Sequence, residues 1–154
     1  MIIRKARPEE AEALTQLALR SKRSWGYDDA FMAAIMDDMI VRPLYLKDEH
    51  GIVAQAGTDV AGYAILRLDD DEAYLRDLFV EPAFMRIGVG AALFHHMISF
   101  ARAQEAKRSW LHSDPHSIGF YKRYGLRVIG EEPSTVVPKR KIPVMLISLT
   151  AIEF

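Results

Sequence analysis

The stretch Ala73–Gly90, AYLRDLFVEPAFMRIGVG, decides how the rest of the chain is organised. Its first half has the composition of a β-strand, and Pro82 ends that strand because proline cannot donate to a sheet ladder. Gly88 and Gly90 then open a long segment whose apolar residues recur at helical spacing. A strand, a tight turn and glycines at a helix start leave backbone N–H groups free, and such a site suits a diphosphate.

Length and composition restrict the class of protein. The chain has 154 residues and a net charge of −1, which favours one domain over residues 1–154 and gives no support for nucleic acid or an anionic membrane as partner. The N-terminus lacks an apolar signal core, so we expect a cytoplasmic protein. The absence of cysteine excludes disulfides and a cysteine nucleophile. His95 and His96 are adjacent and cannot share a helix face, so no metal site is expected.

The residues before this stretch predict one strand, two helices and two further strands. Proline at a first helical position and aspartate at an N-cap mark the helix starts, and a change to period two marks the strands. The expected elements are a strand from Ile2, a helix from Pro8, a helix capped by Asp28 or Asp29 that Pro43 ends or follows, and strands over Ile52–Ala56 and Val60–Leu68.

The residues after it predict two helices and three strands. They are a helix from Gly90 to about Ala106, a strand over Ser109–Ser113, a helix from Asp114 to Gly125, and closing strands over Arg127–Gly130 and Ile142–Leu149. The order β, α, α, β, β, β, α, β, α, β, β predicts a mixed central sheet with helices on both faces, an α+β (α/β three-layer) domain.

Two motifs in this order resemble the GNAT N-acetyltransferase superfamily. Residues 75–93, LRDLFVEPAFMRIGVGAAL, are similar to the family's strand and acyl-CoA pyrophosphate loop. Residues 114–126, DPHSIGFYKRYGL, are similar to its N-P-x-A-x-x-F-Y-x-x-x-G-F segment. Two positions depart from the pattern: Met85 stands where the family usually has Arg or Gln, and Asp114 where it often has Asn. The resemblance covers nearly the whole chain and implies the GNAT acyl-CoA N-acyltransferase fold.

The resemblance also implies a site for acetyl-CoA. Backbone N–H groups from Arg86 to Ala91 would bind the diphosphate, and the amide-rich pantetheine would pair with the strand edge at Phe79 and Val80. The residues expected at the cofactor are Leu78, Phe79, Val80, Met85, Arg86, Ile87, Gly88, Val89, Gly90, Ala91, Asp114, Ser117, Ile118, Phe120 and Tyr121.

Acyl transfer to an amine needs a proton donor for the thiolate and a proton acceptor for the amine. Tyr121 matches the family's tyrosine that donates a proton to the thiolate. A thiol pKa of ~8.5 and a phenol pKa of ~10 make this proton transfer roughly balanced. The candidates for the proton acceptor are Asp77, Glu81 and, less favoured, His112, and the sequence does not distinguish among them. Asp77 is equally well read as a structural carboxylate. Strand alternation places it on the side of Phe79.

The acceptor side is expected near the loop between the first two helices. Trp25 and Tyr27 are candidates for an aromatic wall around a small amine, or alternatively a hydrophobic contact between the helices. Arg140 is a candidate partner for a carboxylate on the acceptor. The resulting hypothesis is an acetyl-CoA-dependent N-acetyltransferase that acts on a small-molecule amine or an exposed protein amine by direct transfer in a ternary complex.

Two other classes remain as alternatives. A catalytically silent acyl-CoA sensor of the same fold would bind the cofactor without turnover. A dinucleotide-binding module needs a third glycine where Leu93 stands, and repeated parallel βαβ units that this order lacks. A homodimer through the last strands is a further hypothesis.

Overall fold

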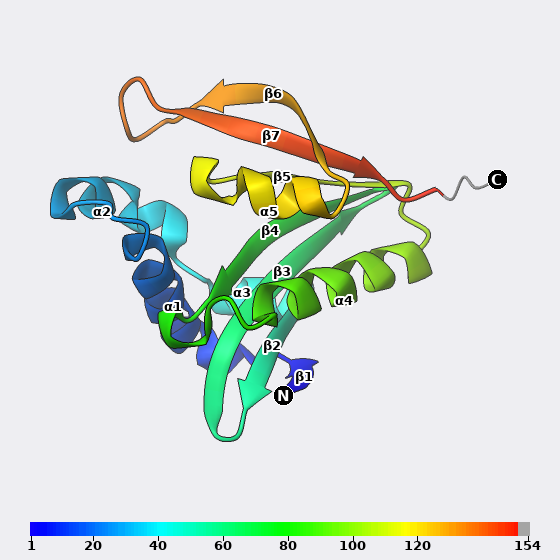
Figure 1. The fold of residues 1–154 in the computed structure, drawn as a ribbon. Helices are drawn as coiled ribbons and strands as arrows, with labels where there is room; N and C mark the ends of the chain where they lie inside the picture. Colours follow the sequence, from blue (N-terminus) through cyan, green and yellow to red (C-terminus); the bar gives the residue numbers. More distant parts are fainter. Residues whose placement is uncertain (151–154) are drawn as a thin grey trace.

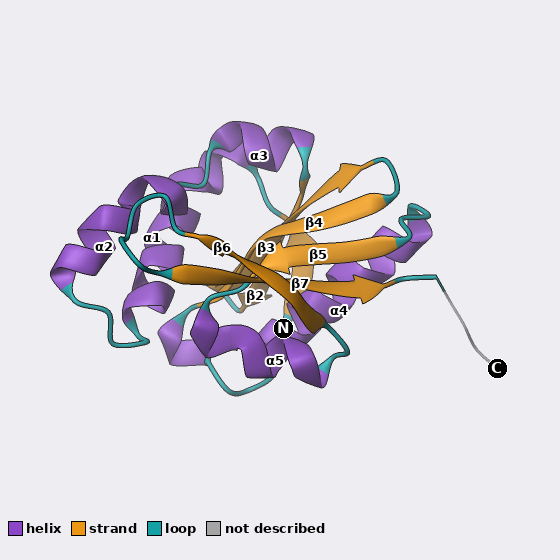
Figure 2. Ribbon diagram, turned by 90° about the horizontal axis from the view of Figure 1, so that it is seen from above, coloured by secondary structure: helices purple, strands orange, loops and turns teal. Residues whose placement is uncertain are grey.

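The computed structural model describes residues 1–150 and contains a seven-stranded sheet with helices on both faces (Figures 1 and 2). The strand order is β1-β2-β3-β4-β5-β7-β6. The strands are β1 (Ile2–Lys5), β2 (His50–Ala56), β3 (Asp59–Asp69), β4 (Glu72–Val80), β5 (Arg108–His112), β6 (Arg127–Pro133) and β7 (Lys141–Ser148). The α-helices are α1 (Ala11–Arg23), α2 (Asp29–Ile35), α3 (Pro43–Asp48), α4 (Val89–Ala103) and α5 (Ile118–Arg123).

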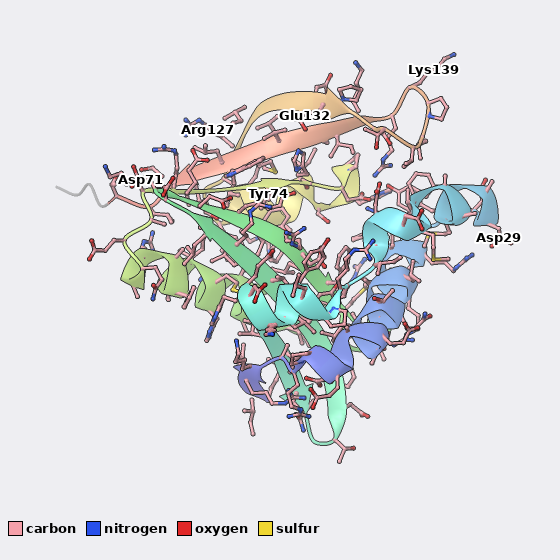
Figure 3. All side chains as sticks on the ribbon, turned by 180° about the vertical axis from the view of Figure 1, so that it is seen from behind. Asp29, Asp71, Tyr74, Arg127, Glu132 and Lys139 are labelled. Atoms are coloured by element: carbon pink, nitrogen blue, oxygen red, sulfur yellow. The ribbon has the colours of Figure 1, made fainter. Side chains whose placement is uncertain are left out.

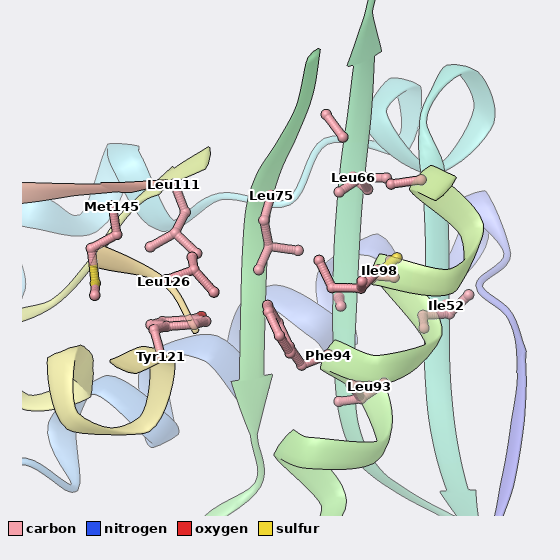
Figure 4. Close-up of a cluster of buried hydrophobic side chains, with 14 of the residues drawn as sticks. Ile52, Leu66, Leu75, Leu93, Phe94, Ile98, Leu111, Tyr121, Leu126 and Met145 are labelled. Carbon is pink, nitrogen blue, oxygen red and sulfur yellow. The ribbon is translucent and has the colours of Figure 1, made fainter. Parts of the chain in front are cut away.

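The two faces of the sheet carry separate hydrophobic cores. Helices α4 and α5 contribute to the first, where Leu93 and Phe94 pack with Leu75 (Figure 4). Helices α1, α2 and α3 contribute to the second, where Leu14 and Leu46 pack with side chains of β2 and β3. Complete burial of one such leucine is worth about 1.5–3 kcal/mol, so each layer is held firmly to the sheet. In the part of the chain that the structure describes, no helix is long and apolar enough to cross a bilayer.

The expected α+β architecture is confirmed, with one additional helix. The sequence suggests that Pro43 ends the second helix or follows its end; in the structure it follows that helix and begins α3 as the first helical residue. Arg42 before it has extended backbone (ψ 141°), which a residue preceding proline favours. Six residues are too few to display a helical period, so this helix left no signal in the pattern.

Strand β4 has two irregularities that open the sheet at its centre. A bulge breaks its register with β3: Asp77 pairs with Ile65, and Leu75 pairs with Leu66, which leaves Arg76 as the extra residue. The parallel pairing between β4 and β5 covers only residues 72–74 and 108–110. Beyond Tyr74, β4 is paired with β3 on one side and, among residues 1–150, with no strand on the other, so β4 and β5 part.

Candidate active site

The turn before α4 presents free backbone amides. Gly88 is the N-cap residue with φ +93°, a conformation that glycine adopts without strain, and Arg86 before it also has positive φ (+66°). The Ala92 amide makes a 3.0 Å hydrogen bond to the Gly88 carbonyl, so the helical amides before Ala92 have no partner within the helix. A Cβ at Gly90 would lie 3.4 Å from the ring of Phe120, at ordinary contact distance, so α4 and α5 lie side by side here.

The edge of β4 that faces the opening adjoins this turn. Leu78 and Val80 pack against the core on the α4 side, whereas Phe79 packs against the core on the α1 side. Half of the backbone groups along this segment point away from β3, where no strand meets them. An extended, amide-rich ligand can therefore pair with this edge.

Tyr121 lies at the inner end of the opening, on the α4 side of the sheet. Its ring is surrounded by Leu111, Leu126 and Met145 and makes an edge contact with Phe94 at 5.8 Å between centroids (Figure 4). Burial, and secondarily the charge of Asp77, raise the pKa of Tyr121 well above its usual value. The phenol is therefore protonated, and available as a donor, throughout the neutral and mildly alkaline range.

Asp77 lies on the other face of the sheet. Its Oδ2 accepts a 2.9 Å hydrogen bond from the Tyr63 hydroxyl, and burial raises the pKa of Asp77 to about 6. The carboxylate borders a pocket of about 250 Å³. The other residues that line this pocket are Asp37, Asp38, Ile40, Arg42, Tyr45 and Arg76.

The carboxylate of Asp114 connects four segments at the mouth of the site. It accepts hydrogen bonds from the Lys22 ammonium (2.7 Å), the Tyr27 hydroxyl (2.9 Å) and the Arg140 guanidinium (3.3 Å). It also caps its own turn by accepting from the backbone amide of His116 at 2.8 Å. Burial alone would raise the pKa of Asp114, but the Lys22 charge and these hydrogen bonds outweigh burial and hold it well below its usual range.

The three residues expected on the acceptor side are brought together around this carboxylate. Tyr27 binds it through its hydroxyl, and Arg140 binds both that hydroxyl (3.1 Å) and Asp114. Trp25, which is 38% exposed, stacks on the ring of His116 with centroids 5.1 Å apart. Aromatic and cationic groups thus form one wall beside the opening between β4 and β5.

The sequence matches the acetyltransferase (GNAT) family over residues 11–126. The chain belongs to this family. The matched region includes the glycine turn, both strands that part, and Tyr121. No curated protein sequence matches the chain.

Solved structures of other GNAT proteins share the fold over almost the full length of this chain. PaiA N-acetyltransferase from Thermoplasma acidophilum, in complex with coenzyme A, has a TM-score of 0.78 at 17% identity, covering 96% of this chain and 98% of its own. The ribosomal-protein-S18-alanine N-acetyltransferase from Escherichia coli has a TM-score of 0.73 at 18% identity, covering 99% and 96%. An aminoglycoside 6'-N-acetyltransferase complexed with coenzyme A has a TM-score of 0.73 at 15% identity, covering 100% of both chains.

The other candidate proton acceptors of this GNAT chain differ in their surroundings. Glu81 is engaged by Arg20 through hydrogen bonds of 2.6–3.1 Å. His112 is hydrogen-bonded to Tyr74 and Glu132, two residues that the sequence did not single out. Among residues 1–150, no group of three or more His, Cys, Asp or Glu side chains is arranged to hold a metal ion.

Proposed function

We propose that this GNAT protein transfers an acetyl group from acetyl-CoA directly to the amine of a small molecule or an exposed protein residue. The observation that carries the proposal is the separation of β4 from β5 beyond Tyr74, beside the free amides at the start of α4 and the buried hydroxyl of Tyr121. An extended thioester can enter this opening from the α4 face, while the acceptor side lies on the opposite face.

In this proposal, backbone groups supply most of the cofactor site. The amides of residues 86–91 bind the diphosphate, aided by the positive end of the α4 dipole. The β4 edge at Phe79 and Val80 pairs with the pantetheine, and α5 closes the other side with Ser117, Ile118 and Phe120. Because backbone amides carry the diphosphate, Met85 in place of a cationic or amide side chain weakens the site without abolishing it.

In the proposed reaction, Tyr121 and Asp77 act from opposite faces of the sheet. The acceptor nitrogen attacks the thioester carbon, a backbone N–H of β4 stabilises the developing oxyanion, and the C–S bond breaks. Tyr121 gives its proton to the departing sulfur. Asp77, ionised above pH of about 6, attracts the acceptor's ammonium. Trp25, Tyr27 and Arg140 form the wall against which the acceptor lies.

The test is release of free coenzyme A thiol from acetyl-CoA across a panel of amines. The chain contains no cysteine, so a thiol reagent reports only the product. We expect turnover with at least one amine, and a loss of about 10²-fold or more in kcat for Tyr121→Phe with unchanged binding of coenzyme A. Binding of coenzyme A without turnover on any amine would replace this function with that of an acyl-CoA sensor. No calorimetric response to millimolar coenzyme A from folded protein would contradict both.

We also propose that two copies associate through the last strands. Strand β6 is exposed along its whole length and, within the described part of the chain, pairs only with β7; its apolar side chains Val128 and Ile129 are 42% and 51% exposed. An exposed edge with apolar side chains favours pairing with another strand. Sedimentation analysis of the wild type and of Ile129→Lys tests this, and a wild-type monomer would contradict it.

A further inference from the structure

A histidine at the end of β5 connects two residues that are distant in the sequence. The Nδ1 atom of His112 lies 2.8 Å from the Tyr74 hydroxyl on β4, and its Nε2 atom lies 2.7 Å from Oε1 of Glu132 on β6. Tyr74 and Glu132 are labelled in Figure 3. Three strands therefore contribute one side chain each to a continuous hydrogen-bonded chain.

The chemistry of the end groups fixes the direction of these hydrogen bonds. An ionised Glu132 can only accept, so Nε2 of His112 carries the hydrogen. The neutral imidazole then has a lone pair on Nδ1, which accepts the hydrogen of the Tyr74 hydroxyl. The Tyr74 oxygen retains lone pairs of its own, so it can take up a proton while it passes its hydrogen to His112.

This chain of residues lies where the sheet opens. Tyr74 pairs with Trp110 in the last register position that joins β4 to β5, and His112 follows two residues later, on the same face as Trp110. Asp77 is on this face of β4, as its hydrogen bond to Tyr63 and its influence on the pKa of Tyr74 indicate. Tyr121 is buried in the core on the other face.

The outer end of the chain reaches solvent. The side chains of His112 and Glu132 are 29% and 60% exposed, so a proton that arrives at His112 can leave to bulk water. Asp77 is only partly buried, but its side-chain hydrogen bond leads inward to Tyr63, which is fully buried. A proton can therefore reach solvent through His112, whereas the hydrogen bond of Asp77 leads only into the core.

We propose that Tyr74, His112 and Glu132 form a proton relay that carries the acceptor's proton from the reaction site to solvent, an inference that rests on the proposed acetyl transfer. Before the acceptor nitrogen attacks the thioester carbon, its ammonium passes one proton to the Tyr74 oxygen as the Tyr74 hydrogen passes to His112 Nδ1, which frees the nitrogen lone pair. The imidazolium then loses the proton on Nε2, beside Glu132, to water, and exchange with solvent restores the starting tautomer. Asp77 keeps the role of attracting the ammonium.

The charges that face the relay come from three strands. Arg67 on β3 lies over the Tyr74 ring at 4.9 Å, and Arg76 and Asp77 on β4 act on its hydroxyl. Glu132 on β6 supplies the negative charge next to His112 on β5. Burial, and then the Asp77 charge, raise the pKa of Tyr74, so the phenol stays protonated and passes hydrogen only when it receives one.

Kinetics of matched variants test the relay, using n-butylamine, which is charged at neutral pH, and methoxyamine, which is not. We expect His112→Ala to lower kcat/KM for n-butylamine about 10²-fold, with a much smaller loss for methoxyamine and partial recovery when imidazole is added. Tyr74→Phe, which keeps the ring, should show the same preference between the amines. His96→Gln, an exposed histidine on α4, is the control and should behave as wild type. Equal losses for both amines and no response to imidazole would overturn the relay.

Nuclear magnetic resonance tests the relay without turnover. Long-range ¹H–¹⁵N spectra of the wild type should show His112 protonated on Nε2 at neutral pH, and Glu132→Gln should alter this signature. A His112 protonated on Nδ1 overturns the relay even if the enzyme is active. A wild type with no activity on any amine, but with the expected tautomer, tells against the proposed function instead.

Discussion

At the scale of single residues, the site combines one carboxyl and one phenol whose pKa values are both raised by burial. The pKa of Asp77 rises to about 6, and that of Tyr121 rises well above its usual value. The first therefore ionises within the range where enzymes are assayed, and the second does not. Activity should depend on pH through the carboxyl and remain insensitive to ionisation of the phenol.

Asp77→Asn should lower activity and raise stability. The folded state binds the Asp77 proton more tightly than the unfolded chain, so the cost of its charge is absent below pH of about 4 and develops as the pH rises through about 6. At pH 8 we expect the variant to be more stable by about 1–2 kcal/mol, allowing for its partial exposure. At pH 4 the difference should vanish.

Thermal unfolding at both pH values, beside kcat/KM on the best amine of the panel, measures this trade-off. Tyr63→Phe is the matched control, because it removes the donor to Asp77 and retains the carboxyl. A variant that is less stable than the wild type at pH 8 would contradict the assignment of a costly buried charge.

At the scale of elements, the Asp114 carboxylate holds the end of α1, the loop before α2 and the loop before β7 to the turn that begins α5. Its side chain is 8% exposed, and those of Lys22 and Arg140 are 13% and 15% exposed. Asp114→Asn leaves two nearly buried cations without a countercharge, which costs about 2–4 kcal/mol. The acceptor KM should rise several-fold, because Tyr27 and Arg140 lose their common partner.

Lys22→Met together with Asp114→Asn is the comparison that isolates charge. The double variant should recover part of the lost stability, because one uncompensated cation is gone. Chemical denaturation of the wild type, the two single variants and the double variant measures the coupling. If the stability losses of the two single variants add up strictly in the double variant, Asp114 stabilises the protein through the shape of its side chain and not through its charge.

The turn before α4 offers a matched pair of glycine variants. Gly88 and Gly57 both have positive φ (+93° and +63°), and an added Cβ at either position meets nothing within 4 Å. Alanine at each should therefore cost about 1–2 kcal/mol through backbone strain alone. Only Gly88→Ala should weaken binding of coenzyme A, by about tenfold or more. Equal affinities in the two variants, by calorimetry, would contradict a diphosphate site at this turn.

The sequence predicted the features that depend on residues close together in the chain and missed those that depend on residues far apart in it. The strand, turn and helix around Gly88, and the cap at Asp114, depend on local signals and were predicted. Helix α3 was too short to show a period. The contacts of His112 depend on the register of β4, β5 and β6, which no local pattern contains. The contacts of Lys22, Tyr27 and Arg140 with Asp114 likewise form only when four segments meet.

At the scale of the whole molecule, the parted strands form a passage between the two faces of the sheet. The α4 core with Tyr121 lies on one face, and Asp77 with the acceptor wall lies on the other. In the proposed function the sites for the two reactants do not overlap, so we expect that neither reactant has to leave before the other binds.

This geometry has a consequence for product inhibition. Coenzyme A occupies the groove of the incoming donor and should inhibit competitively toward acetyl-CoA, but noncompetitively toward the amine. Double-reciprocal plots for the two substrates should intersect, whereas parallel lines would indicate an acetylated enzyme and a single shared entrance.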